Sequence, residues 1–446
     1  MVLTPWGRGE ELRARMLDSG PRASAEEAAE NQRQRLFGAM VASCAEKGYE
    51  GTTVADLLQL AGMSRRDFYK HFADREACFL ATLDELFRMT GLTVRNRLES
   101  EGSWEERAQA SLEVFIKLVI AQPAAARLCL VEAYTVGDAA LERLDAATRT
   151  FQALVRATLG ERPGHEAMPS EISDAMVGAM RKLIHSRLHR GTEAELAGIA
   201  PTLLELALAY VPPPEQLRAR PRRRARANSG PAERSDWARQ AEADDSAERI
   251  IRATMELVAA HGFQAVRIGE IAERAGVSLS TFYDTFEGKA EAFDAALYAG
   301  RTRLIGVAMP AYKRARSWPE AMRELTAASY AFLASEPEFA HLVTSSVLGA
   351  GSEALERHEI AMQSAQWPLK DGEKLFEAGL GALEIEAVML TCYSLMCEWI
   401  QNKGAEDLPR ATPLATYLAL SPFIGPGDAA KVANGGRYPT AAPPRS

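Results

Sequence analysis

Apolar residues recur at intervals of three and four along almost the whole chain, and we find no segment with the apolar and polar alternation of a strand. This spacing places apolar side chains on one face of a helix, so it predicts an all-α protein. The first long helix is expected from Ser24, which forms a capping-box pattern with Glu27, to Gly48. A matching helix is expected from about Asp245 to Gly262.

The two helices belong to a pattern that the chain contains twice. Matching residues keep one separation (262 − 48 = 214 and 357 − 143 = 214), and they include Gly62 with Gly276, Tyr69 with Tyr283, Trp104 with Trp318, Pro123 with Pro337, and Leu141 to Arg143 with Leu355 to Arg357. Further on, the separation of Gly191 and Gly404 is one residue shorter, as expected where a loop changes length. We conclude that the chain is a tandem duplication.

Each copy continues with two short helices around a tight turn, predicted at 53–61 and 64–72 in the first copy. The turn is Ala61-Gly62-Met63-Ser64, and Ala275-Gly276-Val277-Ser278 repeats it. Glycine supplies the positive φ of the bend, the apolar residue fills the angle between the helices, and serine caps the second helix. This arrangement is typical of a helix-turn-helix.

The residues around these turns resemble the DNA-binding domain of TetR-type transcriptional regulators. The resemblance rests on Lys47-Gly48-Tyr49, Thr52-Thr53-Val54, Leu57, the turn residues, Phe68 to Phe72 and Arg75-Glu76, and on their counterparts around Gly262, Ile271, Phe282-Tyr283, Phe286 and Lys289. It implies two TetR-like units, each with a three-helix DNA-binding domain and a helical effector and dimerisation domain. The last helices of each copy, 171–210 and 373–420, match the positions at which two such units pair.

The pattern and the resemblance together divide the chain into seven segments. We expect a flexible N-terminal arm (1–23), a first DNA-binding domain (24–90), a first effector and dimerisation domain (91–211), a linker rich in arginine and proline (212–244), a second DNA-binding domain (245–300), a second effector and dimerisation domain (301–424) and a flexible tail (425–446). The two units can pair within one chain as a pseudo-dimer, or like units can pair in a homodimer.

In the first DNA-binding domain, Phe68 and Phe72 lie one turn apart and face inward, which leaves a basic outer face. Arginine can donate two hydrogen bonds to guanine, tyrosine and lysine reach phosphates, and helix N-termini favour phosphate. The alternative is that the arginines only solvate a surface helix. The expected contacts to double-stranded DNA are Thr53, Ser64, Arg65, Arg66, Tyr69, Lys70, His71 and Arg75.

The second DNA-binding domain lacks most of this charge. Leu279, Ser280, Asp284 and Thr285 stand where the first domain has Arg65, Arg66, Lys70 and His71. A carboxylate facing phosphates is repelled, so we expect weaker binding, partly offset by Arg267 in place of Thr53; the alternative is a domain that keeps its fold without touching DNA. The candidate contacts are Arg267, Ser278, Ser280, Thr281, Tyr283 and Lys289.

The linker opens with three prolines, and six of its arginines, from Arg218 to Arg226, follow closely without an acid among them. Such a segment is often only a solvated tether, but beside a DNA-binding domain it can lie along phosphates or in a narrow minor groove. Its candidate contacts are Arg220, Arg222, Arg223 and Arg224. As a coil of ~33 residues it has an r.m.s. span of about 30 Å, enough to let two units of one chain pair.

The stripe Met389, Tyr393 and Met396 on a helix of the second copy indicates a core or interface, with an effector pocket for an apolar small molecule as the alternative. His185 and His189 have the spacing of a metal pair but lack a third ligand nearby, so no metal and no cofactor are expected. We find no nucleophile elbow, P-loop, dinucleotide fingerprint or HExxH motif, so enzymatic activity is not expected.

The net charge of −8, from 52 basic and 60 acidic side chains, argues against wholesale coating of nucleic acid but not against a local basic face. The odd number of cysteines and the lack of a long apolar run or secretion signal indicate a cytoplasmic protein without membrane contact. We therefore expect a ligand-responsive repressor. The alternatives are an architectural DNA-binding protein without an effector, and a helical adaptor that no longer binds DNA.

Overall fold

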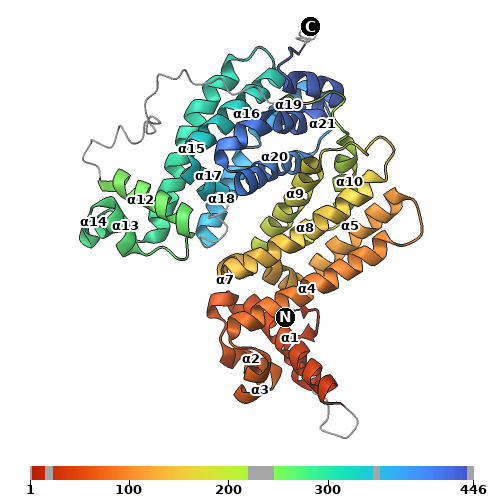
Figure 1. Ribbon diagram of the computed structural model, residues 1–446, viewed down its shortest axis with the longest axis vertical. Coiled ribbons are helices and arrows are strands. Elements are labelled where there is room, and N and C mark those ends of the chain that lie inside the picture. The colour runs from red at the N-terminus through yellow and green to blue at the C-terminus, as the bar shows by residue number, and fades with distance from the viewer. Residues whose placement is uncertain (1–2, 16–23, 219–245, 345–351, 439–446) are drawn as a thin grey trace. The chain divides into compact units, whose positions relative to one another are not determined.

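The computed structural model describes residues 3–15, 24–218, 246–344 and 352–438. The chain forms two compact units, Met1–Ala207 and Leu208–Ser446, coloured red to yellow and green to blue in Figure 1. Nearly all of the described secondary structure is helical, which confirms the predicted all-α class; the exception is an antiparallel pair of two-residue strands, β1 (Leu3–Thr4) and β2 (Gly7–Arg8). The linker candidates Arg220, Arg222, Arg223 and Arg224 lie outside the described residues.

Unit 1 consists of the strand pair followed by a series of long and short helices. Its helices are η1 (Gly9–Glu11), η2 (Arg13–Arg15), α1 (Ala25–Gly51), α2 (Val54–Ala61), α3 (Arg65–His71), α4 (Arg75–Leu98), α5 (Trp104–Ala121), α6 (Pro123–Arg127), the π-helical turn η3 (Leu128–Glu132), α7 (Ala133–Val136), α8 (Asp138–Gly160), α9 (Ser170–His189), η4 (Glu193–Leu196) and α10 (Ala200–Ala209). We call α1, α2, α3 and the start of α4 head one, and the rest of the unit body one.

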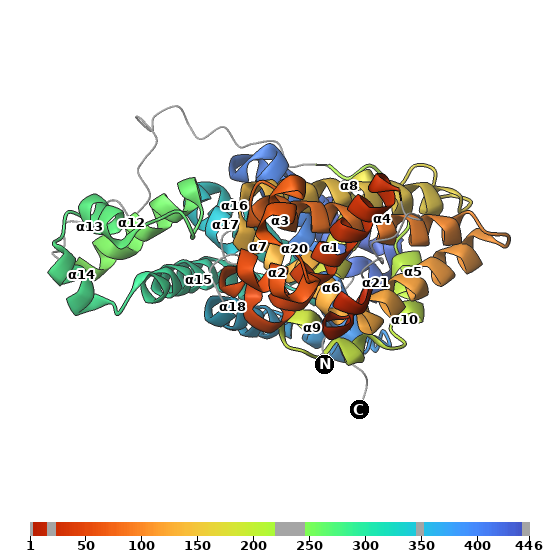
Figure 2. The ribbon, with the colours of Figure 1, turned by 90° about the horizontal axis from the view of Figure 1, so that it is seen from below.

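Unit 2 repeats this order with changes near its end. Its helices are α12 (Ser246–His261), α13 (Ile268–Ala275), α14 (Leu279–Thr285), α15 (Lys289–Arg314), α16 (Trp318–Ser335), α17 (Pro337–Thr344), α18 (Ser352–Ser364), α19 (Trp367–Phe376), α20 (Ala382–Lys403), η6 (Ala405–Ala411) and α21 (Thr412–Ala433). Figure 2 shows α12, α13 and α14 grouped at the end of α15; with the start of α15 they form head two.

The predicted start of the first helix is confirmed. The Ser24 hydroxyl accepts a hydrogen bond from the Glu27 N–H at 3.1 Å, and the Glu27 carboxylate accepts one from the Ser24 N–H at 2.7 Å. The helical conformation breaks at Gly48, where φ is 70°, and one further turn runs to Gly51. The expected second start, Asp245, lies outside the described residues.

The expectation of a flexible N-terminal arm is wrong for residues 3–15. Leu12 is fully buried and Trp6 is 7% exposed, and both pack against α1 at Gly38. A Cβ atom on Gly38 would lie 2.5 Å from a Leu12 methyl carbon, so only glycine leaves this space. The arm folds because these two large apolar side chains face a helix surface of small residues.

The expected flexible tail is also corrected, because α21 continues to Ala433. The helical conformation breaks at Gly425, where φ is 74°, but it resumes at once, and Ala430 and Val432 are fully buried. The residues that open the linker lie against this helix: Asn434 accepts a hydrogen bond from the Arg218 N–H at 2.7 Å. Burial of small apolar side chains therefore extends unit 2 past residue 424.

Two segments of unit 1 are broken into short helices. η4 and α10 are separated at Gly198, where φ is 78°. The segment 123–136 consists of α6, the π-helical turn η3 and α7. Tyr210, at the end of the first repeat, is fully buried in unit 2, where its hydroxyl donates to the Leu418 carbonyl at 3.2 Å.

A basic side chain at the start of the fourth helix holds each head together. Arg75 Nη1 donates to the carbonyls of Tyr49, Glu50 and Thr52, at 3.1 Å for Tyr49, and the guanidinium lies 4.2 Å from the centre of the Tyr49 ring. We call this arrangement the carbonyl clamp. It ties the loop after α1 to α4, which is a single helix running from head one into body one.

Head two contains the same clamp with lysine in place of arginine. Lys289 Nζ donates to the Phe263 carbonyl at 2.7 Å and to the Val266 carbonyl at 2.8 Å, and lies 4.4 Å from the centre of the Phe263 ring. These contacts correct the expectation that Arg75 and Lys289 face DNA. Carbonyls left unpaired inside a protein cost free energy, so both cations serve the fold.

Among the described residues, no single helix combines the length and the hydropathy needed to span a membrane; α5 and the α6–α7 segment meet that measure only as a pair bent by 99°. All five cysteines carry free thiols, and four of them are buried.

Leu12→Ala should lower the free energy of unfolding by about 2 to 5 kcal/mol, because it opens a cavity between the arm and α1. Urea denaturation checks this value. The control is Leu92→Ala on α4, where the side chain is 46% exposed and the change should stay within about 0.5 kcal/mol. Equal effects of the two substitutions would show that the arm does not contribute to the core.

The duplicated clamp predicts which substitutions head one tolerates. Arg75→Lys should cost less than about 1 kcal/mol, because Lys289 makes the same contacts in head two, whereas Arg75→Ala should cost about 2 to 3 kcal/mol through the loss of charged hydrogen bonds. Urea denaturation gives the free energies, and hydrogen exchange of the α2 and α3 amides locates the loss. An equal loss for both substitutions would contradict the clamp.

Candidate nucleic-acid interface and pocket

In head one, α2 and α3 form the predicted helix-turn-helix. Thr53 caps α2, with its hydroxyl accepting from the Asp56 N–H at 3.2 Å, and Ser64 caps α3 by accepting from the Asp67 N–H at 3.2 Å. Between the helices Gly62 adopts the left-handed conformation, with φ of 63°. Both predicted contacts, Thr53 and Ser64, are exposed and act first as helix caps.

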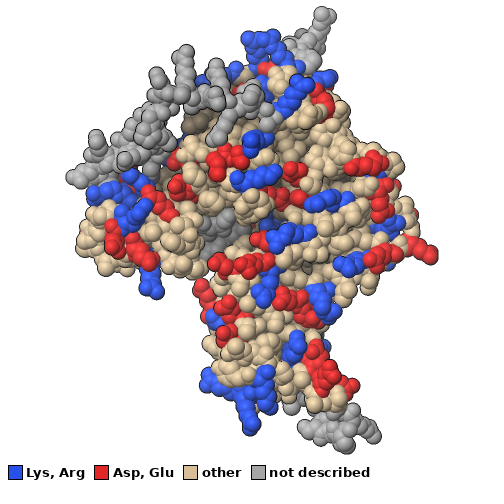
Figure 3. Space-filling model, in the orientation of Figure 1, with Lys and Arg blue, Asp and Glu red and all other residues tan. Residues whose placement is uncertain are grey.

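The outer face of α3 carries the predicted basic set. Arg65, Arg66 and Lys70 are exposed, Tyr69 is 50% exposed, and Phe68 is buried beneath them. Figure 3 shows Lys and Arg gathered on head one over α2 and α3. An exposed short helix with two arginines at its start has the chemistry of a major-groove reader.

Two members of the set are already engaged within head one. Lys70 Nζ pairs with the Asp67 carboxylate at 2.7 Å, which lowers the pKa of Asp67. His71 is partly buried, with Nε2 2.8 Å from Gln32 Oε1 on α1, and burial lowers its pKa. His71 is therefore turned toward α1, which corrects its assignment as a DNA contact, whereas Lys70 stays on the outer face.

The recognition helix of head two has the same frame but different chemistry. Ser278 caps α14 by accepting from the Thr281 N–H at 3.0 Å, and the two hydroxyls are 2.8 Å apart. Leu279 is 53% exposed and Tyr283 is 56% exposed, as Tyr69 is in head one. Ser280 and Asp284 are also exposed, so the outer face of α14 carries apolar, hydroxyl and carboxylate groups rather than basic ones.

Arg267 precedes α13 at the position of Thr53, and its N–H donates to the Glu270 carboxylate at 2.8 Å. Its exposed side chain remains a candidate contact. Two positions that face the N-terminal arm in head one are charged in head two. Arg252 and Glu256 stand there in place of Gly38 and Ala42. They line a hollow of about 300 Å³ with Arg249 and Arg274, a feature that the sequence reading missed.

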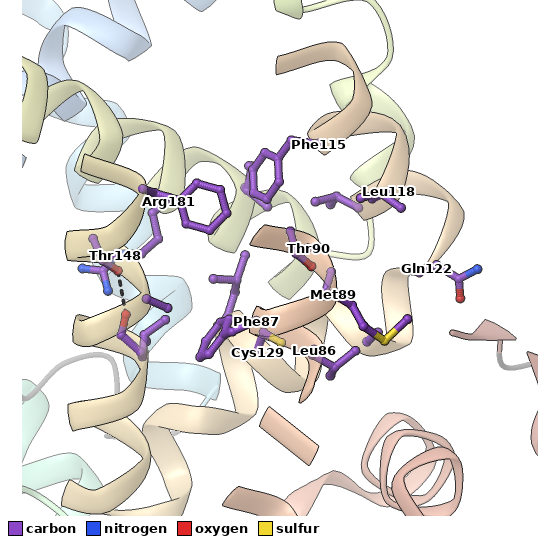
Figure 4. A pocket seen from close by; sticks show the side chains of 18 of the residues that line it. Leu86, Phe87, Met89, Thr90, Phe115, Leu118, Gln122, Cys129, Thr148 and Arg181 are labelled. Atoms are coloured by element: carbon purple, nitrogen blue, oxygen red, sulfur yellow. Dashed lines mark hydrogen bonds between the residues drawn. The ribbon is translucent and has the colours of Figure 1, made fainter. Parts of the chain in front are cut away.

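Body one contains an apolar pocket of about 170 Å³ between α4, α5, α8, α9 and the π-helical turn. Figure 4 shows Phe87, Phe115 and Leu118 around it, with Cys129 of η3 at its base. The side chains that shape it are mostly large and apolar, including Phe87, Met89, Phe115, Leu118, Phe151 and Ile184. Sequence reasoning missed this pocket because its lining has the periodicity of ordinary core.

The effector residues suggested by the sequence belong instead to the interior of unit 2. Met389 is 9% exposed, and the Tyr393 hydroxyl donates to the Val343 carbonyl at 2.6 Å and lies 3.3 Å from His358 Nε2. Met396 lies on the same helix and is partly buried. These contacts fit the core interpretation of the stripe and not the alternative of an effector pocket.

The positions of unit 2 that match the pocket lining of body one carry different side chains. Arg301 and His358 stand where body one has Phe87 and Leu144, and Arg301 Nη2 lies 2.7 Å from His358 Nδ1. At the positions of Met89 and Gln122 stand Arg303 and Glu336, whose side chains pair at 2.8 Å. Polar pairs thus replace the apolar lining.

The histidine pair on α9 does not assemble a metal site. His185 is buried, its ring stacks 6.3 Å from His189 and it meets the Tyr134 ring edge-on at 5.7 Å. Burial is the main cause that lowers the pKa of His185 to about 3, so the ring is neutral. Among the described residues, no cluster of three His, Cys, Asp or Glu side chains is arranged for metal binding.

Comparison with known protein families finds a match in each of the two heads. The model of the N-terminal domain of bacterial regulatory proteins of the tetR family matches residues 39–82 and 250–296, which fall within head one and head two. No curated protein matches the chain.

Solved structures similar to part of the chain include three regulators. The fatty acid degradation regulator FadR from Bacillus halodurans is 16% identical, with a TM-score of 0.36 over 39% of this chain and 96% of that one. FadR from Bacillus subtilis, in complex with stearoyl-CoA, is 14% identical with the same score and coverage. A putative TetR-family regulator from Mesorhizobium loti is 19% identical, with a TM-score of 0.32 over 41% of this chain and 96% of that one. Two segments of the chain, one in head one and one in head two, thus match the tetR family of bacterial regulatory proteins.

Proposed function

We propose that this regulator is a ligand-responsive repressor in which head one supplies most of the DNA affinity. The observation that carries the proposal is the exposed basic face of α3. Arg65 and Arg66 project from the start of the helix, where side chains of a recognition helix reach base edges, and each can donate two hydrogen bonds to guanine. Tyr69 and Lys70 lie further along the helix and reach phosphates.

Head two reads a different half-site in this proposal. Leu279 replaces Arg65, and an exposed apolar side chain at that position suits the methyl group of thymine. Ser280, Thr281 and Tyr283 offer hydroxyl groups, and Arg267 adds a cation before α13. Because head two makes fewer phosphate contacts, it adds less affinity than head one. Its different side chains make the two half-sites differ in sequence.

The two units pair within one chain in this proposal, which makes the free protein a pseudo-dimer. Heads of a paired regulator bind successive major-groove faces ~34 to 36 Å apart. Because α3 and α14 carry different side chains, an intrachain pair selects a non-palindromic site. Pairing of like units between two chains would select a palindrome instead.

The pocket is connected to head one through the π-helical turn. Cys129 and Leu130 of η3 line the pocket, and Glu132 at the end of the same turn accepts a hydrogen bond from the Tyr49 N–H at 2.9 Å. The Tyr49 carbonyl belongs to the carbonyl clamp. A ligand that displaces η3 would therefore move the loop that positions α2 and α3, and π-helical turns often occur at such functional sites.

Selection of bound duplexes from a random pool by the purified full chain tests the DNA-binding function, and Arg66→Ala tests the assignment of head one. The substitution should cost about 1 to 3 kcal/mol and relax the preference at one base position, whereas Ser280→Ala should cost less. Fluorescence anisotropy on the selected site measures both. A larger loss for Ser280→Ala would reverse the roles of the heads, and diffuse protection in footprinting would indicate an architectural protein.

Glu132 predicts a pH dependence of stability. Burial raises its pKa, outweighing the hydrogen bond from the Tyr49 N–H. A carboxyl group with a raised pKa in the folded state destabilises the fold as the pH rises through that pKa. Glu132→Gln removes the charge and keeps an acceptor. The melting temperature of this variant minus that of the natural chain should therefore be more positive at pH 7.5 than at pH 5. A pH-independent difference would contradict the burial of this charge.

A further inference from the structure

One side chain gives the pocket in body one a polar end. Arg181 of α9 lines the pocket, and its Nε atom is buried without a hydrogen-bond partner among the described residues. The Asp145 carboxylate lies 3.9 Å from Nη1, at the limit of an ion pair. A buried N–H group without a partner costs about 1 to 3 kcal/mol. The edge of the guanidinium formed by Nε and Nη is therefore ready for an acceptor.

Two of the three threonine hydroxyl groups in the lining already donate hydrogen bonds to the backbone. The Thr148 hydroxyl donates to the Leu144 carbonyl at 2.8 Å, as drawn in Figure 4, and the Thr93 hydroxyl donates to the Met89 carbonyl at 2.9 Å. Gln122 lies on the opposite side of the pocket from Arg181 and has a buried Oε1 atom without a partner. An acceptor on a ligand is thus best placed at the Arg181 end, and any donor at the Gln122 end.

Charge and size together define the ligand class. A planar carboxylate can accept two parallel hydrogen bonds from one edge of a guanidinium, and such charged pairs are about twice as strong as neutral ones. A cavity of about 150 Å³ is large enough for benzene, and this pocket measures about 170 Å³. The space suits one ring or a short alkyl chain, but not a long acyl chain with a large head group.

We propose that the effector is a small amphipathic acid, with a carboxylate on Arg181 and a ring or short chain among the aromatic side chains of the pocket. This inference rests on the proposed ligand response of body one and specifies its chemistry. Desolvation of the apolar part supplies affinity, while the carboxylate on Arg181 discriminates against alcohols and amines of the same length.

The duplication predicts one ligand for each chain. In unit 2, the register places Arg301 and His358 at the positions of Phe87 and Leu144, and these two side chains contact each other at 2.7 Å. Phe339, in place of Ala125, fills the space beside Gly300, where a Cβ atom would lie 2.1 Å from its ring. An apolar ligand would have to break the polar contact and displace this ring.

Isothermal titration of the full chain with octanoate, 3-phenylpropanoate, 1-octanol and octylamine tests the proposal. The acids should bind at one site per chain, and Arg181→Gln should weaken them by about 10- to 100-fold while leaving 1-octanol within about twofold. The matched control is Arg156→Gln. Arg156 of α8 pairs with Asp174 of α9 at 2.7 Å, between the same two helices, but it lies outside the pocket lining. This control should leave acid binding unchanged.

A second variant separates the pocket from its charge. Ala147→Trp fills the lining at α8 and should abolish binding of acid and alcohol alike, with folding checked by its melting temperature. Binding of 1-octanol as tight as that of octanoate, an unchanged affinity in Arg181→Gln, two sites per chain or no binding of either acid would each overturn this inference. The proposed function is tested separately. Selection of a DNA site tests whether the chain binds DNA. Release of that DNA by a ligand whose binding Ala147→Trp blocks tests whether the chain responds to a ligand.

Discussion

The carbonyl clamp is the contact on which the geometry of each head depends. A helix-turn-helix of two short helices buries little surface of its own, so its position must come from the loop before it and the long helix after it. Arg75 joins these two parts through the carbonyls of Tyr49, Glu50 and Thr52, and Lys289 does so in head two. Because α4 and α15 run on into the bodies, each clamp also fixes the angle between head and body.

The two copies show which constraints the fold imposes and which it leaves free. The central core residue and the turn glycine of the heads are preserved: Phe68 matches Phe282, and Gly62 matches Gly276 with φ of 63° and 64°. Positions on the outer face have changed, and Leu279 stands where Arg65 does. Packing tolerates little change in volume, whereas an exposed side chain affects mainly what the helix can bind.

Sequence reasoning reached the parts of the structure that depend on local chemistry. The cap at Ser24, the turn at Gly62 and the inward face of Phe68 follow from residues close together in the chain. It failed where distant residues decide the outcome: the arm folds because Gly38 leaves room for Leu12, and the pocket exists because helices far apart in sequence do not fill the space around Arg181. A periodic apolar stripe cannot distinguish a filled core from a lined cavity.

Tyr49 joins the two parts of unit 1 that a regulatory signal has to connect. Its N–H donates to Glu132, at the end of the turn that lines the pocket, and its carbonyl accepts from Arg75 in the clamp. A shift of η3 therefore acts on the same peptide segment that positions the helix-turn-helix, without passing through the solvent-exposed face of α3. Coupling of this kind requires an element with two arrangements. The π-helical turn is a suitable one, because its extra residue can be absorbed by returning to α-helical pairing.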